Sequence, residues 1–241
     1  MQKQIKLGLR SDTLTTRLAK GLRKSAKSTT ESYIVYGETE AIFKACASQA
    51  DYTIPEDQRM SILTGKGPPK TADGADLGHA IAKSWWYDTI GLEPTFASWS
   101  QVTYLHMYII TLRLRNLETA DACRNYQRYL TEHFSHAAED KMVLLHNMSA
   151  RSIRNKYLKD LFLQWRGIIT AYDEGIIKGD AVLGGAIWRN LFRGDENVDW
   201  EKVAQVVAFL RRAVQTFGNQ PIHNIVMNSE GPKGLWAQTH S

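Results

Sequence analysis

Three side chains of types that often bind metals lie close together within a predicted helix over residues 119–147. His133, His136 and Glu139 are spaced at i, i+3 and i+6, so a helix would place them on one face. A two-metal site in a helical bundle needs Glu-x-x-His on two helices, and this pattern does not occur in the sequence. We therefore interpret the three residues as a polar, solvated helix face, and we expect no metal and no other cofactor.

A further histidine, His106, lies in an apolar stretch and is a candidate haem ligand. A buried histidine that hydrogen-bonds a neighbouring group explains the same pattern, and we adopt that interpretation. Asp173 and Glu174 are adjacent carboxylates, but neighbouring positions on a helix diverge by about 100°. The motifs G-x-S-x-G, H-E-x-x-H and G-x-G-x-x-G are absent from the sequence. The sequence therefore predicts a protein that is not an enzyme, with a helical haem- or metal-binding enzyme as the alternative.

Positive charge is concentrated at the N-terminus. The 241-residue chain has a formal net charge of +5, yet residues 1–30 contain 8 Lys/Arg and 1 Asp, which is +7. The remaining 22 Lys/Arg and 24 Asp/Glu give −2. The composition of residues 1–30 predicts a mitochondrial targeting segment, or a basic arm for an anionic membrane or ribosomal RNA. An RNA-binding bundle is a second alternative, although the charge of the body does not favour it.

A smaller basic group lies around the start of a predicted helix over residues 152–178. Its members are Arg151, Arg154, Lys156 and Lys159. Such cations can contact ribosomal RNA or acidic lipid, and a solvated helix face gives the same pattern. We name these four residues as the candidate ribosome or RNA contact.

The elements that would position these residues are helices, and the central one is a hairpin over residues 161–192. Apolar residues recur at helical spacing in both halves of this stretch. Between the halves, Gly179 can end one helix and Asp180 can cap the next. Gly184 and Gly185 each lower helix propensity by about 1 kcal/mol, which suggests that another backbone passes close by.

Further helices are predicted on both sides of the hairpin, in a single all-α bundle domain over residues 31–217. No formal charge occurs from Pro94 to Leu112, but polar side chains dilute this stretch, so we expect a buried helix from a Ser98 cap instead of a membrane span. The N-terminal predictions are a helix over 31–52 that starts or breaks at Gly37, a Pro/Gly-rich loop over 53–78, and a short aromatic helix or turn at 85–87. The later predictions are a break near His136, a last helix capped by Asp199, and an extended tail over 218–241.

Two segments resemble a known family. FASWSQVTYLHMYIITLRLR, at 96–115, resembles the central helix of the ubiquinol–cytochrome c chaperone family. AYDEGIIKGDAVLGGAIWRNLF, at 171–192, resembles the second signature of that family. The resemblance extends over about residues 33–215, and the two segments at this separation are more specific than either alone.

The resemblance implies an all-helical mitochondrial assembly factor for complex III, the ubiquinol–cytochrome c reductase. It implies a non-enzymatic chaperone that pairs with a small helical partner subunit near the tunnel exit of the mitoribosome. It also implies that the protein supports the synthesis of cytochrome b and binds the new chain, on the matrix side and peripheral to the inner membrane. The basic N-terminal segment agrees with this picture.

A chaperone of this kind needs an apolar groove that its own chain leaves uncovered. A helix of the client or of the partner would dock in such a groove. Our candidates for the groove are Trp99, Tyr104, Tyr172, Trp188 and Phe192. The expected polar rim is Asp173, Glu174 and Arg189.

Overall fold

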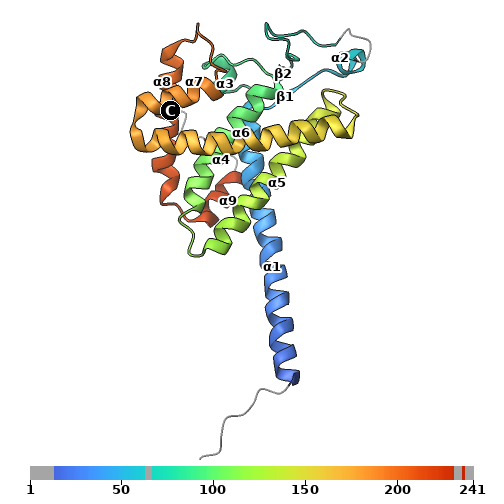
Figure 1. The fold of residues 1–241 in the computed structure, drawn as a ribbon, viewed down its shortest axis with the longest axis vertical. Helices are drawn as coiled ribbons and strands as arrows, with labels where there is room; N and C mark the ends of the chain where they lie inside the picture. Colours follow the sequence, from blue (N-terminus) through green and yellow to red (C-terminus); the bar gives the residue numbers. More distant parts are fainter. Residues whose placement is uncertain (1–13, 63–66, 231–234, 237–241) are drawn as a thin grey trace, which may run out of the picture.

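The computed structural model describes residues 14–62, 67–230 and 235–236, and it is an all-α bundle. The fold class predicted from the sequence is therefore confirmed. The first helix, α1 (Leu14–Ala47), continues without interruption through Gly37, where the sequence suggested a start or break. Its first half extends away from the body, whereas its second half packs against α4, α5 and α9 (Figure 1).

A central helix, α4 (Phe96–Leu114), is buried on nearly every side because α1, α5, α6 and α8 surround it. Its N-cap is Thr95, whose Oγ1 accepts from the Ser98 amide at 3.2 Å, so the predicted cap at Ser98 is wrong by one turn. Among the residues that the structure describes, none of the helices combines the length and hydropathy needed to cross a membrane.

The region between α1 and α4 contains more structure than the loop predicted over residues 53–78. After η1 (Ser48–Ala50), the strand β1 (Tyr52–Thr53) pairs antiparallel with β2 (His79–Ala80), and α2 (Glu56–Ser61) lies between them in sequence. Propensity could not reveal two-residue strands. The short aromatic helix is present as α3 (Trp85–Asp88), with Ser84 as its N-cap.

Two long helices, α5 (Ala120–Leu144) and α6 (Arg151–Lys178), form a hairpin whose end protrudes from the body (Figure 1). Helix α5 passes His136 without the suggested break. Helix α6 ends at Gly179, which has a φ of +110° and is also the N-cap of α7 (Asp180–Asn190). The predicted cap at Asp180 is therefore wrong, because that residue is already helical.

The close approach in this second hairpin occurs at Gly175, and not at Gly184 and Gly185 as the sequence suggested. A Cβ at Gly175 would lie 2.6 Å from the Leu183 Cα, so α6 and α7 touch backbone to backbone there. At Gly184 the nearest atoms within reach are side-chain methyls of α8, 3.7 and 3.8 Å away.

The sequence predicted an extended tail over residues 218–241, but a helix lies within its described part, and residues 231–234 and 237–241 fall outside the described residues. Helix α8 (Trp200–Gly218) begins at the predicted Asp199 cap, and α9 (Ile222–Glu230) follows it. Trp236 is 1% exposed, and its Nε1 donates to the Ala45 carbonyl at 3.1 Å. The prediction failed because α9 is only nine residues long and places just two residues, Ile222 and Ile225, in the core, and because the contact of Trp236 with α1 is remote in sequence.

Candidate functional site

Three of the aromatic residues predicted to line a groove lie in the core instead. Trp99, Tyr104 and Tyr172 are 0%, 1% and 1% exposed. Trp99 stacks on Phe134 with ring centroids 5.5 Å apart, and the Tyr104 hydroxyl donates to the Leu161 carbonyl at 2.9 Å. The three aromatic rings hold the bundle together, so they do not form an uncovered surface.

Asp173, predicted as a rim residue, joins α6 to α4. Its carboxylate accepts from Arg115 Nη1 and Nη2 at 2.8 and 2.9 Å, and from the Tyr108 hydroxyl at 3.0 Å. Burial, with the Asp173 charge beside it, raises the pKa of Tyr108, so this hydroxyl stays protonated and remains a donor. Glu174 is exposed, and it pairs with Lys178 at 2.6 Å.

The remaining predicted residues lie at the surface on α7 and just after it. Trp188 is half-buried, and its Nε1 donates to the Asp195 carbonyl at 2.7 Å. Arg189 is exposed, whereas Phe192 is half-buried against the core. The Trp188 ring lies 5.9 Å from the ring of Trp200, which is 58% exposed at the start of α8. A half-buried tryptophan and an exposed one therefore lie next to each other at one end of α7.

Beside this pair, an open groove of about 280 Å³ runs between α7 and α8. The buried side chains of Val203 and Val207 reach within 4 Å of the Cβ position at Gly184, so α7 and α8 are in close contact beneath the groove. Small side chains give the groove its depth. Its lining residues are Asp180, Ala181, Gly184, Trp200, Val203, Ala204, Val207 and Ala208.

We call these eight residues the α7–α8 groove. At one end of it the Arg211 Nε donates to Asp180 at 3.0 Å, which leaves an ion pair beside an apolar channel. The sequence analysis missed this groove because Ala204 and Ala208 are small, and because Trp200 recurs at helical spacing with apolar residues of α8 that are buried, such as Val203 and Val207. Glycine and alanine at helical spacing on two adjacent helices were the available signal.

The basic residues of α6 differ in their surroundings. Arg154 donates to Glu139 Oε1 at 3.0 Å and to the carbonyls of Met148 and Ser149 at 3.0 and 2.6 Å, so it fixes the α5–α6 connection. Arg151, Lys156 and Lys159 are exposed. The structure therefore brings three of the four predicted cations to the surface and gives the fourth a structural role.

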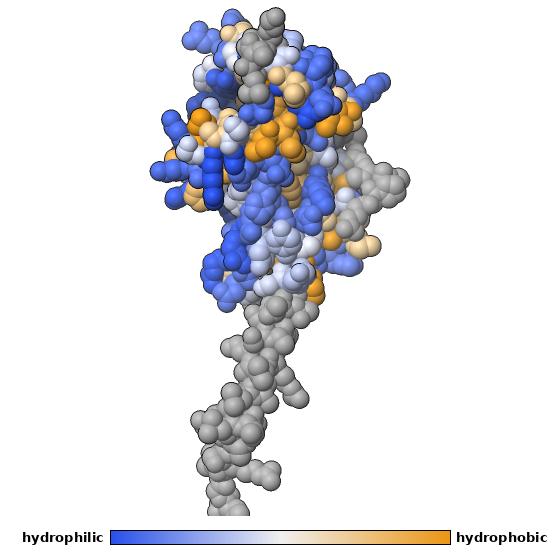
Figure 2. Space-filling view, turned by 90° about the vertical axis from the view of Figure 1, so that its right-hand side faces the viewer, coloured by the Kyte–Doolittle hydropathy of each residue, from blue (hydrophilic) through white to orange (hydrophobic). Residues whose placement is uncertain are grey.

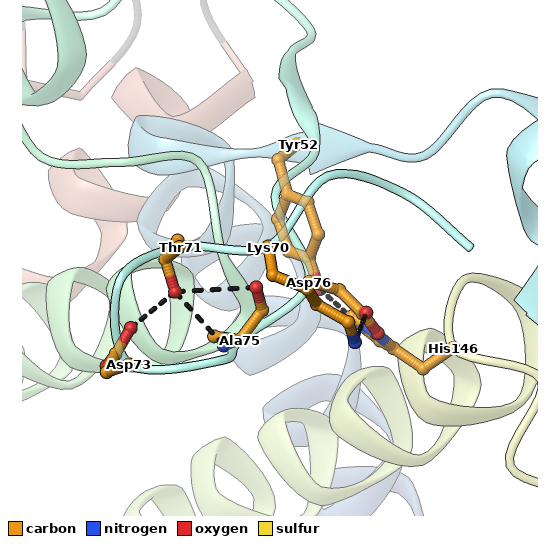
Figure 3. A network of polar contacts seen from close by, with 7 residues as sticks. All are labelled: Tyr52, Lys70, Thr71, Asp73, Ala75, Asp76 and His146. Atoms are coloured by element: carbon orange, nitrogen blue, oxygen red, sulfur yellow. Dashed lines mark hydrogen bonds and ion pairs between the residues drawn. The ribbon is translucent and has the colours of Figure 1, made fainter. Parts of the chain in front are cut away.

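A polar network ties the segment before β2 to the end of α5 (Figure 3). The Tyr52 hydroxyl lies 2.7 Å from His146 Nε2, and His146 Nδ1 lies 2.7 Å from Asp76 Oδ2. The Asp76 carboxylate can only accept, so His146 Nδ1 donates to it. Burial raises the pKa of Tyr52, so the hydroxyl beside Nε2 stays protonated. Lys70 also pairs with Asp76. These contacts form a structural clamp between three segments.

The histidines that the sequence offered as ligands have other roles. His106 is fully buried, and its Nδ1 bonds the Val102 carbonyl at 2.8 Å, as expected of a core histidine. His133 is 6% exposed, so the predicted solvated face is wrong at this position, and its Nε2 lies 3.2 Å from Thr39 Oγ1. Within the described ranges, no group of three or more His, Cys, Asp or Glu could hold a metal ion.

Comparison with known proteins gives one family. The model of the family described as Ubiquinol-cytochrome C chaperone matches residues 88–229. This range reaches from α3 to α9 and therefore contains α4, the α5–α6 hairpin and both helices of the groove. No solved structure matches the chain.

Three curated relatives are similar to parts of the chain. Protein CBP3, mitochondrial, of Saccharomyces cerevisiae is 36% identical over 126 residues, which is 52% of this chain and 37% of that protein. Ubiquinol-cytochrome c reductase complex assembly factor 1 of Drosophila melanogaster is 26% identical over 157 residues, 64% of this chain and 58% of that protein. The Xenopus laevis protein of the corresponding name is 24% identical over 145 residues, 60% of this chain and 70% of that protein. The matches cover less than two thirds of the first two relatives.

Proposed function

This chain belongs to the ubiquinol–cytochrome c chaperone family, and we propose that it is a non-enzymatic chaperone and assembly factor for complex III. The family match over residues 88–229 carries this proposal. The names of two relatives support it, because both are assembly factors of the ubiquinol-cytochrome c reductase complex. The name of the yeast relative supports a mitochondrial location.

Within that role, we propose that newly synthesised cytochrome b is the client. The protein would bind it near the exit of the mitoribosome, on the matrix side of the inner membrane and peripheral to it. A small helical partner subunit would complete a heterodimer. These finer parts come from the family resemblance of the two segments at 96–115 and 171–192, and they agree with the basic composition of residues 1–30.

The α7–α8 groove is the surface that we propose for the client. The exposed Trp200 ring can cover one side of a docked helix, while Ala204 and Ala208 let its backbone approach closely. The groove replaces the surface predicted around Trp99, Tyr104 and Tyr172, and it retains Trp188 at its border. Apolar side chains of a transmembrane client would be kept from water until later assembly steps.

Substitutions that fill the groove test this proposal. Ala204→Arg with Ala208→Arg places two long side chains into it from exposed positions of α8, without replacing any core residue. In a strain that lacks the wild-type protein, we expect this variant to leave pulse-labelled cytochrome b and assembled complex III far below normal, while other mitochondrial translation products persist. Gln215→Arg, at an exposed position of α8 outside the groove, is the matched control.

A photo-crosslinker at position 204 adds a direct measurement. It should capture newly made cytochrome b, and the same crosslinker at position 215 should not. Normal cytochrome b in a deletion strain would refute the assembly role altogether. Normal cytochrome b in the filled-groove variant alone would place the client elsewhere on the protein.

A further inference from the structure

We infer that the end of the α5–α6 hairpin docks the protein onto an anionic lipid surface. We call residues 141–159 the hairpin tip. The inference rests on the proposed function for the presence of a membrane nearby, and it adds the surface and the lipid chemistry. Three properties of the hairpin tip carry it, namely its exposed apolar side chains, its charge and its shape.

Large apolar side chains are exposed on both helices of the hairpin tip. Val143 and Leu144 at the end of α5 are 40% and 62% exposed, and Ile153 and Tyr157 on α6 are 48% and 49% exposed. Helix α2 lies against the tip, since Arg59 Nη1 donates to the Leu144 carbonyl at 3.0 Å, and the adjacent Met60 is 67% exposed. Apolar side chains that gather at a surface indicate a binding site for another apolar phase.

Figure 2 looks onto the side of the molecule toward which the hairpin tip projects in Figure 1. Apolar residues, in orange, gather on the upper part of the body between hydrophilic residues, in blue (Figure 2). An apolar surface bordered by polar side chains suits the boundary between water and lipid, where both kinds of group are satisfied.

The charge of the hairpin tip is entirely positive. Residues 141–159 contain five Lys/Arg and no Asp or Glu. Lys141 is paired with Asp51 at 2.6 Å, and Arg154 with Glu139 at 3.0 Å, whereas Arg151, Lys156 and Lys159 are exposed. Each cation near an anionic leaflet adds about 1 kcal/mol of attraction. The acids nearest in sequence, Asp140 and Asp160, lie just outside the segment, and α2 adds Glu56 and Asp57.

Shape and composition together favour lipid over a partner helix or RNA. A partner helix binds in a groove, but the hairpin tip protrudes, so it is better suited to enter a deformable interface. RNA could use Lys156, Lys159 and the Tyr157 ring, but the exposed aliphatic side chains of the tip, such as Leu144, offer it neither charge nor a stacking surface. Anionic lipid uses both sets of side chains.

Flotation of the full-length protein with lipid vesicles tests the inference. We expect binding to vesicles of phosphatidylcholine with phosphatidylglycerol, and much weaker binding to phosphatidylcholine alone. Lys156→Glu with Lys159→Glu should lower the vesicle partition coefficient at least about tenfold, since it removes two attractive charges. Leu144→Ser with Ile153→Ser should lower it about tenfold through lost apolar insertion. Circular dichroism checks that each variant is folded.

Matched variants separate the hairpin tip from general effects of charge and apolar area. Arg124→Glu with Arg128→Glu makes the corresponding charge reversals on exposed residues at the other end of α5, and Ile177→Ser removes an apolar side chain that is 84% exposed. Both control variants should bind vesicles as the wild type does.

The inference is overturned if the tip variants lose no more vesicle binding than these controls, because the basic residues 1–30 would then account for it. It is also overturned if the protein binds a single-stranded RNA oligonucleotide but not the anionic vesicles. Neither result touches the cytochrome b phenotype of the deletion strain, so this inference and the proposed assembly role can fail separately.

Discussion

The α7–α8 groove and the hairpin tip both expose apolar surface, but they do so with opposite shapes. The groove is concave and lined mostly by small side chains, and its Asp180 is already paired with Arg211. The hairpin tip is convex, carries large side chains such as Leu144 and Ile153, and has five Lys/Arg without an acid. A concave surface suits a rigid helix, and a convex basic one suits lipid. Exposed hydrophobicity alone therefore does not identify a partner.

The largest effect is expected from a substitution at Gly175, where α6 and α7 touch backbone to backbone; it should disturb the groove and leave the hairpin tip intact. Gly175→Val would force a side chain against the Leu183 Cα, which is 2.6 Å from the Cβ position. We expect the free energy of unfolding to fall by about 3 kcal/mol or more, at the upper end of overpacking costs. The displaced α7 would also distort the groove, so client crosslinking should fall while vesicle binding persists. Chemical denaturation, together with the two binding assays, measures this.

Gly167→Ala, also on α6, is the matched control, because a Cβ at Gly167 would have no atom within 4 Å. This substitution should raise the free energy of unfolding by up to about 1 kcal/mol, since alanine favours helix more than glycine does. Equal destabilisation by both substitutions would mean that the contact between α6 and α7 does not set the groove.

A second prediction concerns the shape of the hairpin tip. Arg154→Met removes the guanidinium that bonds Glu139 and the carbonyls of Met148 and Ser149. We expect a loss of about 2 kcal/mol in unfolding free energy, typical of hydrogen bonds to a charged group. Vesicle binding should weaken, while crosslinking in the α7–α8 groove stays normal.

Arg154→Lys separates geometry from charge at this position. Lysine keeps the positive charge but cannot reproduce the planar fork of donors. Restoration of vesicle binding by lysine would show that charge alone matters. Failure to restore it would show that the connection must be held in shape.

A third, smaller effect follows from the clamp beside the hairpin tip. Burial raises the pKa of Asp76, but hydrogen bonds from Lys70 and His146 outweigh it and hold the pKa below its usual value of 3.8. A lowered folded pKa means that this carboxylate stabilises the fold above the unfolded pKa, and that the contribution is lost as the pH falls through the folded value. Asp76→Asn should therefore cost about 1.5 kcal/mol at neutral pH.

The cost of Asp76→Asn should shrink as the pH falls below about 4, and denaturation of wild type and variant over a pH series measures it. A cost that is independent of pH would mean that the shape of the side chain matters and its charge does not. Client crosslinking should not respond to this substitution, because the clamp lies next to the hairpin tip and not next to the groove.

The smallest expected effect is the change in client capture by the α7–α8 groove when the salt concentration is raised. Raising the ionic strength screens exposed charges, so vesicle binding by the hairpin tip should weaken several-fold between low and physiological salt. Client capture in the apolar groove should change little over that range. Equal salt sensitivity of the two assays would remove the physical distinction between the regions.

Much of the fold could be predicted from periodicity and capping. The helix expected over residues 152–178 is found at Arg151–Lys178, and Asp199 caps α8 as expected. Periodic apolar residues define the face of a helix, and caps define where it begins. Periodicity did not identify β1 and α9, because these elements are only two and nine residues long.

The candidate site was less accessible, because a pattern shows which residues share a face but not what covers that face. Trp99 and Tyr172 are aromatic residues that a groove could have used, yet neighbouring helices enclose them. Leu144 and Ile153 are large apolar residues of the kind that usually fill a core, yet they are exposed. The groove depends on Ala204 and Ala208, because their small side chains leave space between α7 and α8. Whether such a residue is buried or exposed depends on how helices that are distant in sequence pack against each other.

The bond between Trp236 and the Ala45 carbonyl joins residues 191 positions apart, and the matched family range ends before Trp236. Its indole ring also packs edge-on against His106 and Phe217. While the chain is being translated, α1 can therefore have only part of its final surroundings until residue 236 has left the ribosome that makes it. A protein proposed to receive unfinished chains would thus itself lack these contacts until its own synthesis has passed residue 236.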